Sequence, residues 1–232
     1  MKLFIGNKNY SSWSMRPWVL MKEAGIPFEE VRLRFDSFAA GSRFKNEVAR
    51  VSPAGRVPVL LDGEIQVWDS LAIVEYLAER FPDKRIWPRR SGLRLRARSV
   101  CAEMHSGFSD LRTSCQMNIE ASLPEVGVRV LAGSGGVRAD LDRIVALWSE
   151  LLAEHGGPLL FGKFSAADAY FAPVVMRMRT YALPVPSGIR RYAEEVVGLA
   201  SVSEWMRDAL AENDFVEFEE PYRSQPRDKD DA

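Results

Sequence analysis

The stretch from Val51 to Phe81 constrains the fold more than any other part of the sequence. It contains two short runs that favour β-structure, Val59–Asp62 and Ile65–Trp68, which are joined across Asp62-Gly63. Such a dipeptide supplies the positive φ that a tight hairpin turn requires. The sequence therefore predicts a two-stranded antiparallel ribbon.

A helix is predicted to begin where this ribbon ends. Asp69 and Ser70 precede apolar residues that recur at helical spacing from Leu71 to Phe81, and Pro82 ends the pattern. The first backbone N–H groups of a helix are unpaired and carry partial positive charge, and the hydroxyl of Ser70 adds one more donor. This helix start is therefore suited to bind a carboxylate.

Pro58 follows Val57 at the entrance to the ribbon. Proline has no N–H, and a cis bond here would turn the chain and leave the backbone groups of Val57 free for an outside partner. Only about 5–6% of X–Pro bonds in folded proteins are cis. The residues alone therefore favour a trans bond in an edge hairpin that is followed by a capped helix.

The segments before this stretch predict a small mixed sheet covered by helices. Leu3–Gly6 is typical of a buried strand, Phe28–Leu33 alternates as a second strand, and Ser42–Val51 favours a short helix. Between the two strands, a helix is predicted to begin close to Trp13 or Ser14. A helical crossover makes these two strands parallel, so the predicted order is β-α-β-α-β-β-α.

Beyond this unit the sequence predicts only helices. We divide the chain into an α/β domain at 1–82, a linker at 83–91, an all-α domain at 92–218, and a charged tail at 219–232 that is expected to be flexible. The predicted helices of the all-α domain are Gly92–Met117, Val137–Ala153, one that starts at Ser165, Ile189–Val197 and Ser203–Glu212.

The helix that starts at Ser165 carries a capping signal. Ser165 stands at the N-cap and Asp168 follows three residues later, where its carboxylate can reach back to the cap and suits the helix dipole. We interpret this pair as a device of the fold and not of catalysis.

Both halves of the sequence resemble the glutathione transferase superfamily. The string GRVPVL, the hairpin and then DSLAIVEYL are similar to the thioredoxin-like N-terminal domain of that family, and the capping signal matches one in its helical domain. The resemblance implies a cis bond before Pro58 and a backbone contact from Val57 to the cysteinyl part of glutathione. It also implies that Asp69 and Ser70 hold the γ-glutamyl carboxylate, with glutathione as co-substrate.

The loop and helix start from Asn9 to Arg16 form the second candidate site. A hydroxyl-rich turn that enters a helix offers donors to an anion, although on these residues alone an ordinary N-cap is the simpler interpretation. The pattern Ser-Ser-x-Ser-x-Arg resembles the Ser-Ser-Cys motif of zeta-class glutathione transferases, with Trp13 where that class has Cys. Alignment on the arginine implies that Ser11 is the catalytic serine, with Ser12 as the close second.

The implied mechanism needs no protein nucleophile. A glutathione thiol with a free pKa of about 8.5 is mostly protonated at neutral pH, and a hydroxyl donor at a helix N-terminus favours the thiolate. Lowering that pKa by about two units requires roughly 2.7 kcal/mol, which one or two charge-assisted hydrogen bonds can supply. Tyr10 is a weaker alternative donor, of the kind found in tyrosine-type classes, because it lies earlier in the loop.

The predicted long helix offers candidate contacts for the second substrate. His105, Phe108 and Arg112 share one face at spacings of three and four, and Met104 lies beside them. Arg112 could pair with a carboxylate of an acidic electrophile. The competing interpretation, which the residues alone favour, places these side chains in the core of a helix bundle with a solvated arginine.

The composition argues against several other classes of function. With 31 basic and 32 acidic side chains the net charge is -1, which gives no indication of a nucleic-acid or membrane-surface partner. No apolar run reaches membrane-spanning length, and no Cys/His cluster has metal-ligand spacing. Cys101 and Cys115 both fall in the predicted long helix, several turns apart, so we expect no disulfide between them. We therefore expect a reduced, cytoplasmic protein without a metal site.

These observations and the resemblance together predict a glutathione transferase. By resemblance it attacks small hydrophobic electrophiles with a glutathione thiolate, serves in detoxification and forms a homodimer. Two alternatives stay open. One is a glutathione-dependent cis/trans isomerase of maleylacetoacetate type, and the other is a non-catalytic glutathione-binding scaffold.

Overall fold

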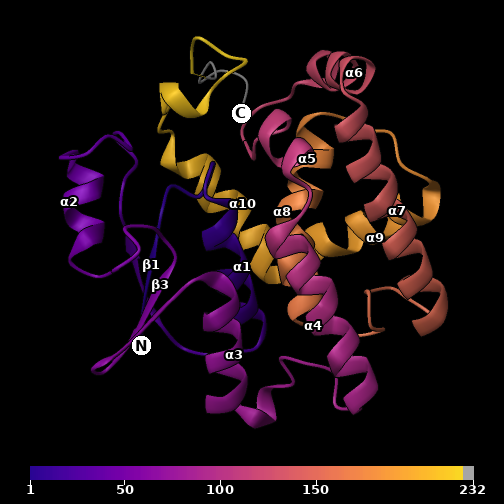
Figure 1. Cartoon of the computed structure of the whole chain (residues 1–232), viewed down its shortest axis with the longest axis horizontal. Coiled ribbons are helices and arrows are strands. Elements are labelled where there is room, and N and C mark those ends of the chain that lie inside the picture. The colour runs from indigo at the N-terminus through magenta and orange to yellow at the C-terminus, as the bar shows by residue number, and fades with distance from the viewer. Residues whose placement is uncertain (227–232) are drawn as a thin grey trace.

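The computed structural model describes residues 1–226, in which an α/β half packs against a helical half (Figure 1). The order of elements in the first half, β-α-β-α-β-β-α, confirms the prediction. The elements are β1 (Lys2–Ile5), α1 (Ser12–Glu23), β2 (Glu29–Arg32), α2 (Arg43–Ala49), β3 (Val59–Asp62), β4 (Ile65–Trp68) and α3 (Ser70–Arg80).

The four strands form one mixed sheet in the order β2-β1-β3-β4. β1 lies parallel to β2 and antiparallel to β3, and β3 pairs antiparallel with β4. Gly63 has φ 61° in the turn between β3 and β4, a conformation that glycine adopts without steric cost. The ribbon read from the sequence is therefore confirmed, and it forms one edge of the sheet.

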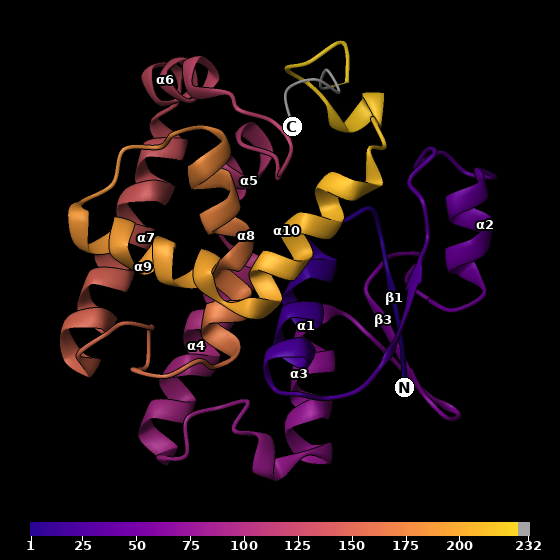
Figure 2. The same cartoon turned by 180° about the vertical axis from the view of Figure 1, so that it is seen from behind.

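Helices cover both faces of this sheet. α2 lies on one face, whereas α1 and α3 lie between the sheet and the helical half (Figures 1 and 2). Phe35, Phe44 and Val48 form part of a small apolar cluster under α2. Trp18 of α1 and Ile73 of α3 belong to the main core, which continues into the helical half.

The second half is built of helices alone among the described residues. Its elements are η1 (Pro82–Lys84), α4 (Ser91–Ser106), α5 (Ser109–Ser114), α6 (Pro124–Gly133), α7 (Gly135–His155), α8 (Ala166–Thr180), α9 (Ser187–Gly198), α10 (Ala200–Glu212) and η2 (Glu217–Glu219). None of the helices among residues 1–226 is long and apolar enough to cross a membrane.

The prediction of one helix from Gly92 to Met117 is wrong, because the chain forms α4 and α5 instead. Gly107 is extended, and Phe108 has φ 57° in the left-handed region. A Cβ at position 107 would lie 2.8 Å from the carbonyl oxygen of Glu103, so the close approach of the chain here requires glycine. The chain therefore turns after α4, and the stripe of apolar residues is divided between two helices.

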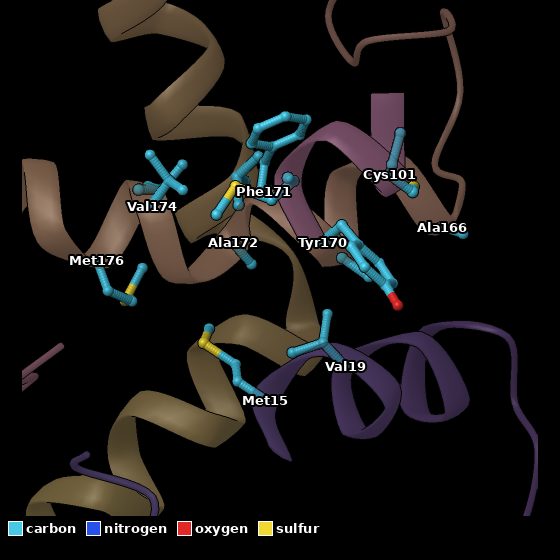
Figure 3. Close-up of a cluster of buried hydrophobic side chains, with 14 of the residues drawn as sticks. Met15, Val19, Cys101, Ala166, Tyr170, Phe171, Ala172, Val174 and Met176 are labelled. Atoms are coloured by element: carbon cyan, nitrogen blue, oxygen red, sulfur yellow. The ribbon is translucent and has the colours of Figure 1, made fainter. Parts of the chain in front are cut away.

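The two halves share a buried boundary formed largely by α1 and α8. Met15 and Val19 of α1 point toward Tyr170 and Ala172 of α8 (Figure 3). All four side chains are completely buried. At the back of the molecule, α10 lies beside α1 and leads to the C-terminal segment (Figure 2). The boundary is therefore a continuous apolar core and fixes how the two halves meet.

The capping signal at the start of α8 is present as predicted. Asp168 accepts hydrogen bonds from the backbone N–H of Ser165 at 2.9 Å and from that of Leu160 at 3.0 Å. The hydroxyls of Ser165 and Tyr192 donate to it at 3.2 and 3.3 Å. Asp168 is wholly buried, and burial raises its pKa to about 6. It thereby ties the loop before α8 to α9.

Ordered contacts continue beyond residue 219, where we expected the flexible tail to begin. Glu220 is only 5% exposed and accepts hydrogen bonds from the Tyr10 hydroxyl at 2.7 Å and the Asn118 amide at 2.8 Å. We call residues 214–223 the C-terminal strap, because they connect the α/β half to the helical half. Residues 227–232 of the predicted tail lie outside the described residues.

Candidate functional site

A cavity of about 570 Å³ lies between the two halves, beside the start of α1. We call it the interdomain cavity. Its walls come from the start of α1, the loop before β3, the region of α5, α8 and the C-terminal strap. The lining residues used below are Tyr10, Ser11, Ser12, Trp13, Phe38, Lys45, Arg56, Val57, Arg112, Arg177 and Glu219.

Ser11 and Ser12 both line this cavity, but their hydroxyls have different partners. The Ser11 hydroxyl donates to Oγ of Ser14 at 2.7 Å, and that oxygen also accepts the Gly6 N–H at 3.2 Å. Oγ of Ser12 instead accepts from Nη2 of Arg177 at 3.4 Å. The Ser12 proton is therefore free to be donated into the cavity, whereas the Ser11 proton is already engaged.

Arg177 of α8 is a cation that enters the cavity without a carboxylate partner among the described residues. It is 5% exposed, and its guanidinium donates to the carbonyl oxygens of Cys115 at 2.8 Å and Pro173 at 3.1 Å. Burial, together with the nearby cations Arg16 and Arg112, lowers the pKa of Arg177 to about 9. An anion in the cavity would relieve this uncompensated charge.

Arg112 approaches the same cavity from α5. Its Nη1 donates to the carbonyl oxygens of His105 at 3.2 Å and Gly107 at 3.0 Å, which terminate α4. Burial also lowers the pKa of Arg112. Arg112 therefore closes a helix end and adds positive charge to the cavity wall, so it is not the fully solvated side chain of the competing interpretation.

Val57 lines the cavity, and the bond to Pro58 is cis, as the resemblance implied. Pro58 itself is buried. Within residues 1–226 no other residue hydrogen-bonds to the Val57 backbone. The loop that enters β3 therefore presents an unpaired peptide group at the cavity, where an extended peptide could pair with it.

Asp69 and Ser70 do not line the interdomain cavity. Asp69 caps α3 with φ 74°, and its Oδ1 accepts the Leu71 N–H at 2.8 Å. Ser70 is 1% exposed, and its Oγ accepts the Tyr170 hydroxyl at 3.3 Å. The structure therefore places this predicted pair at the start of α3, as expected. This part of the boundary between the two halves is separate from the interdomain cavity.

His105 and Trp13 stand between Asp69 and the cavity. Nε2 of His105 lies 3.3 Å from Oδ2 of Asp69, and the imidazole meets the Trp13 ring edge to face at a centroid distance of 5.1 Å. Burial lowers the pKa of His105, which opposes the effect of the nearby carboxylate. Trp13 itself lines the cavity, so these two rings link the two predicted parts of the site.

The predicted face of His105, Phe108 and Arg112 on one helix is wrong, because α4 ends before Phe108. Met104 is completely buried and Phe108 is 6% exposed, and both belong to the main core. Of the four predicted substrate contacts, only Arg112 lines the interdomain cavity.

Arg16 is a second buried guanidinium near this site. Its Nε and Nη1 have no hydrogen-bond partner in the described part of the chain, and burial lowers its pKa to about 10. The guanidinium carbon lies 4.2 Å from the ring centroid of Trp13 and 4.8 Å from that of Tyr170. Cation–π contacts therefore hold Arg16, which forms no ion pair with a carboxylate of residues 1–226.

The C-terminal strap contributes Glu219 to the wall of the cavity. Tyr10, the alternative donor, gives its hydroxyl to Glu220, and burial raises its pKa. Phe218 of the strap meets Phe38 edge to face at 4.9 Å. Glu219 lines the cavity, and burial raises its pKa to about 7. The Tyr10 hydroxyl therefore donates its proton to a residue of the strap and holds the strap in place.

Sequence reasoning missed Arg177, Lys45 and Arg56 as lining residues. A local signal existed for Arg177, which lies seven positions after Tyr170 and so falls on the same buried face of α8. A charged residue on an apolar helix face is a candidate functional group. No comparable local pattern distinguishes Lys45 or Arg56 from ordinary surface cations.

Comparisons with known proteins agree with this architecture. A family model described as the glutathione S-transferase N-terminal domain matches residues 10–80, and one described as the C-terminal domain matches residues 106–214. A zeta-class glutathione S-transferase of Euphorbia esula is 36% identical over 78 residues, which are 34% of this chain and 33% of that protein. The chain therefore matches only a third of the length of this relative.

Two further comparisons extend over most of the chain. A probable maleylacetoacetate isomerase of Caenorhabditis elegans is 27% identical over 169 residues, 71% of this chain and 72% of that protein. A solved structure of maleyl pyruvate isomerase, a bacterial zeta-class protein, superposes with a TM-score of 0.68 at 21% identity and covers 90% of this chain and 98% of that one. At this identity the structural likeness shows the fold alone.

Proposed function

Because the chain belongs to the glutathione transferase superfamily, we propose that it binds glutathione in the interdomain cavity and holds the thiol as a thiolate. The thiolate then attacks small hydrophobic electrophiles. One observation carries this proposal: Ser11, Ser12 and the unpaired backbone of Val57 line the same cavity. In the cytoplasm, where the cysteine usage and composition lead us to place the protein, such a reaction would serve detoxification.

Ser12 is the stronger candidate for the thiolate donor. Its oxygen accepts from the Arg177 guanidinium, which strengthens the hydroxyl as a donor and leaves its proton free. The positive charge of Arg177 favours a thiolate directly as well. Ser11, which the resemblance placed first, contributes by fixing the loop through Ser14.

Paired serine variants test this assignment. We expect Ser12→Ala to raise the pKa of the bound glutathione thiol by about 2 units, toward its free value, because the donor is lost. Ser11→Ala is expected to raise it by about 1 unit or less, since only loop geometry changes. The measurement is the ultraviolet absorbance of the thiolate against pH, with calorimetry to show that glutathione still binds.

Two outcomes would contradict the proposal. If neither variant shifts the thiol pKa, the serines do not activate glutathione. If the unmodified protein binds glutathione without any thiolate absorbance at neutral pH, the chain is a binding scaffold and not a transferase. A larger effect of Ser11→Ala would reverse the two roles.

An isomerase of maleylacetoacetate type is the second candidate, and the cationic wall favours it. Arg112 and Arg177 line the cavity without ion-pair partners in the described part of the chain. A dicarboxylic substrate would supply the missing negative charge. The proposal of glutathione activation is common to both candidates, and turnover of a dicarboxylate distinguishes them.

We also propose that the chain forms a homodimer. Exposed apolar side chains on β4 and α4 support this, because Ile65 is 52%, Trp68 is 44% and Leu95 is 62% exposed. Light scattering of the full chain tests it, and a monomer at micromolar concentration would contradict it.

A further inference from the structure

The C-terminal strap brings one acidic side chain, that of Glu219, to the interdomain cavity. Every other charged residue in the lining formed by residues 1–226 is a cation: Lys45, Arg56, Arg112 and Arg177. The family model for the C-terminal domain ends at residue 214, so the match to glutathione transferases does not extend to Glu219. The chemistry of this carboxyl group therefore follows from its own surroundings.

Contacts of the strap fix Glu219 at the cavity wall. Its neighbour Glu220 accepts the Tyr10 hydroxyl at 2.7 Å, and Tyr10 belongs to the loop that carries the two candidate serines. Three residues further on, the Tyr222 hydroxyl donates to the carbonyl oxygen of Ser114 in α5 at 2.8 Å. In both views the C-terminal segment, in yellow, lies between α2 and the helical half (Figures 1 and 2). The strap is therefore held from both halves around Glu219.

The two adjacent glutamates of the strap have opposite environments. Glu220 accepts hydrogen bonds from Tyr10, Asn118 and Arg223, so its negative charge is compensated. The carboxyl group of Glu219 is half-buried and has no hydrogen-bond or ion-pair partner within residues 1–226. Burial raises the pKa of Glu219 to about 7, and the charge of Glu220 adds to this effect.

The cations of the cavity do not offset this shift. They come from four elements that surround the cavity: α2 with Lys45, the loop before β3 with Arg56, α5 with Arg112, and α8 with Arg177. None of them forms an ion pair with Glu219, and the effects of burial and of Glu220 outweigh theirs. Tyr10, the other acid of the lining, gives its proton to Glu220. Within the described lining, Glu219 is therefore the one side chain that gains and loses a proton near neutral pH.

A glutathione thiolate in the same cavity favours the protonated form of Glu219. Two negative charges in one site repel each other, so the carboxyl pKa rises further once the thiolate is present. The buried guanidinium of Arg177 favours the thiolate, which leaves the proton on the carboxyl group. The complex therefore holds a nucleophile and a protonated acid together, as general acid catalysis requires.

We propose that Glu219 is a catalytic acid, which protonates the electrophile when glutathione adds to an activated carbon–carbon double bond. The thiolate forms a bond to the β-carbon of an α,β-unsaturated carbonyl compound, and the π electrons move to the carbonyl group as an enolate. The Glu219 carboxyl group gives its proton to the α-carbon, and the resulting carboxylate regains a proton from the solvent that reaches this half-buried side chain. This inference rests on the proposed function and deepens it.

Addition and substitution place different demands on such an acid. An addition leaves negative charge on the electrophile, and a proton neutralises it. A substitution that expels chloride needs no proton, because chloride leaves as a stable anion. Both reactions need bound glutathione as a thiolate. A role of Glu219 as an acid therefore affects additions alone, whereas a role in binding glutathione affects both reactions.

The test compares Glu219→Gln with the unmodified full chain on two neutral electrophiles, benzylideneacetone for addition and chlorodinitrobenzene for substitution. Glutamine keeps the size of the side chain but cannot supply the proton. At saturating glutathione we expect kcat/KM for benzylideneacetone to fall at least about tenfold, and kcat/KM for chlorodinitrobenzene to change by less than about twofold. The matched control is Glu217→Gln, an exposed acid of the strap outside the cavity lining, which should change either value by less than about twofold.

The pH profile supplies an independent measurement. In the unmodified protein, kcat/KM for benzylideneacetone is expected to rise as the glutathione thiol ionises and to fall again at higher pH. The fall follows from loss of the Glu219 proton, whose pKa is about 7 before the thiolate raises it further. Glu219→Gln should keep the rise and lack the fall. Chlorodinitrobenzene should show no such fall with either protein.

Three outcomes would overturn the role of Glu219 and leave the proposed function intact. The first is an equal loss with both electrophiles, which would indicate that Glu219 binds glutathione. The second is an unchanged rate and pH profile in Glu219→Gln. The third is an unmodified protein that turns over chlorodinitrobenzene but not benzylideneacetone. If the unmodified protein turns over neither electrophile and forms no thiolate with glutathione, the proposed function itself fails and the role of Glu219 is overturned with it.

Discussion

Two buried charges on α8, Asp168 and Arg177, show how a structural charge differs from a functional one. Asp168 receives four hydrogen bonds, two from backbone N–H groups and two from hydroxyls. Arg177 donates to two carbonyl oxygens and to Ser12, but no carboxylate neutralises it among the described residues. Burying a charged group costs free energy in both cases. Only the Asp168 carboxylate has enough partners within the fold to offset that cost. The difference indicates that Asp168 stabilises the fold, whereas Arg177 is suited to bind an anionic ligand.

The largest expected effect is on stability, at the satisfied charge. Asp168→Ala removes the acceptor from four donors, of which the Leu160 and Ser165 N–H groups are buried. We expect the free energy of unfolding to fall by about 3–5 kcal/mol, because buried donors are left without partners. Urea unfolding followed by circular dichroism measures it. A loss below about 1 kcal/mol would mean that water or a shifted side chain replaces the carboxylate.

Asp168→Asn is the control. Comparing how the free energy of unfolding depends on pH in this variant and in the unmodified protein isolates the titration of Asp168. Burial raises the pKa of Asp168 from 3.8 to about 6 in the folded chain. Between these values the folded chain keeps a proton that the unfolded chain releases, so the contribution of Asp168 to the free energy of unfolding falls as pH rises, by at most about 3 kcal/mol. The asparagine variant cannot titrate and should lack this slope. If both proteins show the same slope, other groups cause it.

The two charges also show which features of the structure can be predicted from the sequence. The hairpin at Asp62-Gly63 and the capping pair Ser165 and Asp168 are local signals, and both were predictable because a turn or a cap is determined by residues a few positions apart. The break at Gly107 was not predicted, because helical spacing on either side of it indicates one continuous helix. Periodicity therefore identified the buried faces and not the end of the helix.

The site was less predictable than the fold, because its parts meet across long sequence separations. Ser11 and Ser12 were found by resemblance, whereas their different hydrogen bonds depend on Ser14 and on Arg177. The Tyr10 hydroxyl looked available from the sequence, yet Glu220, 210 positions away, takes its proton. Such pairings follow from tertiary packing and leave no local pattern.

The smallest expected effect on stability, and the most informative one for function, is at the unsatisfied charge. Arg177→Met is expected to lower kcat/KM for glutathione by about 10–100-fold, because a buried cation no longer favours the thiolate. The free energy of unfolding should change by less than about 1 kcal/mol, since removing an unpaired buried guanidinium also removes its desolvation cost. Steady-state kinetics and urea unfolding of the same preparation measure both quantities.

Arg179→Met is the matched control, because Arg179 lies two residues further along α8 and is exposed. It should leave both quantities near those of the unmodified protein. The choice of substrate adds a second readout: if the cavity takes dicarboxylates, Arg177→Met raises KM for them more than for neutral electrophiles, since only the former lose an ion pair. Should Arg177→Met instead destabilise the chain as much as Asp168→Ala and leave catalysis unchanged, the two charges would have the same structural role. The contrast between them would then say nothing about where an anion binds.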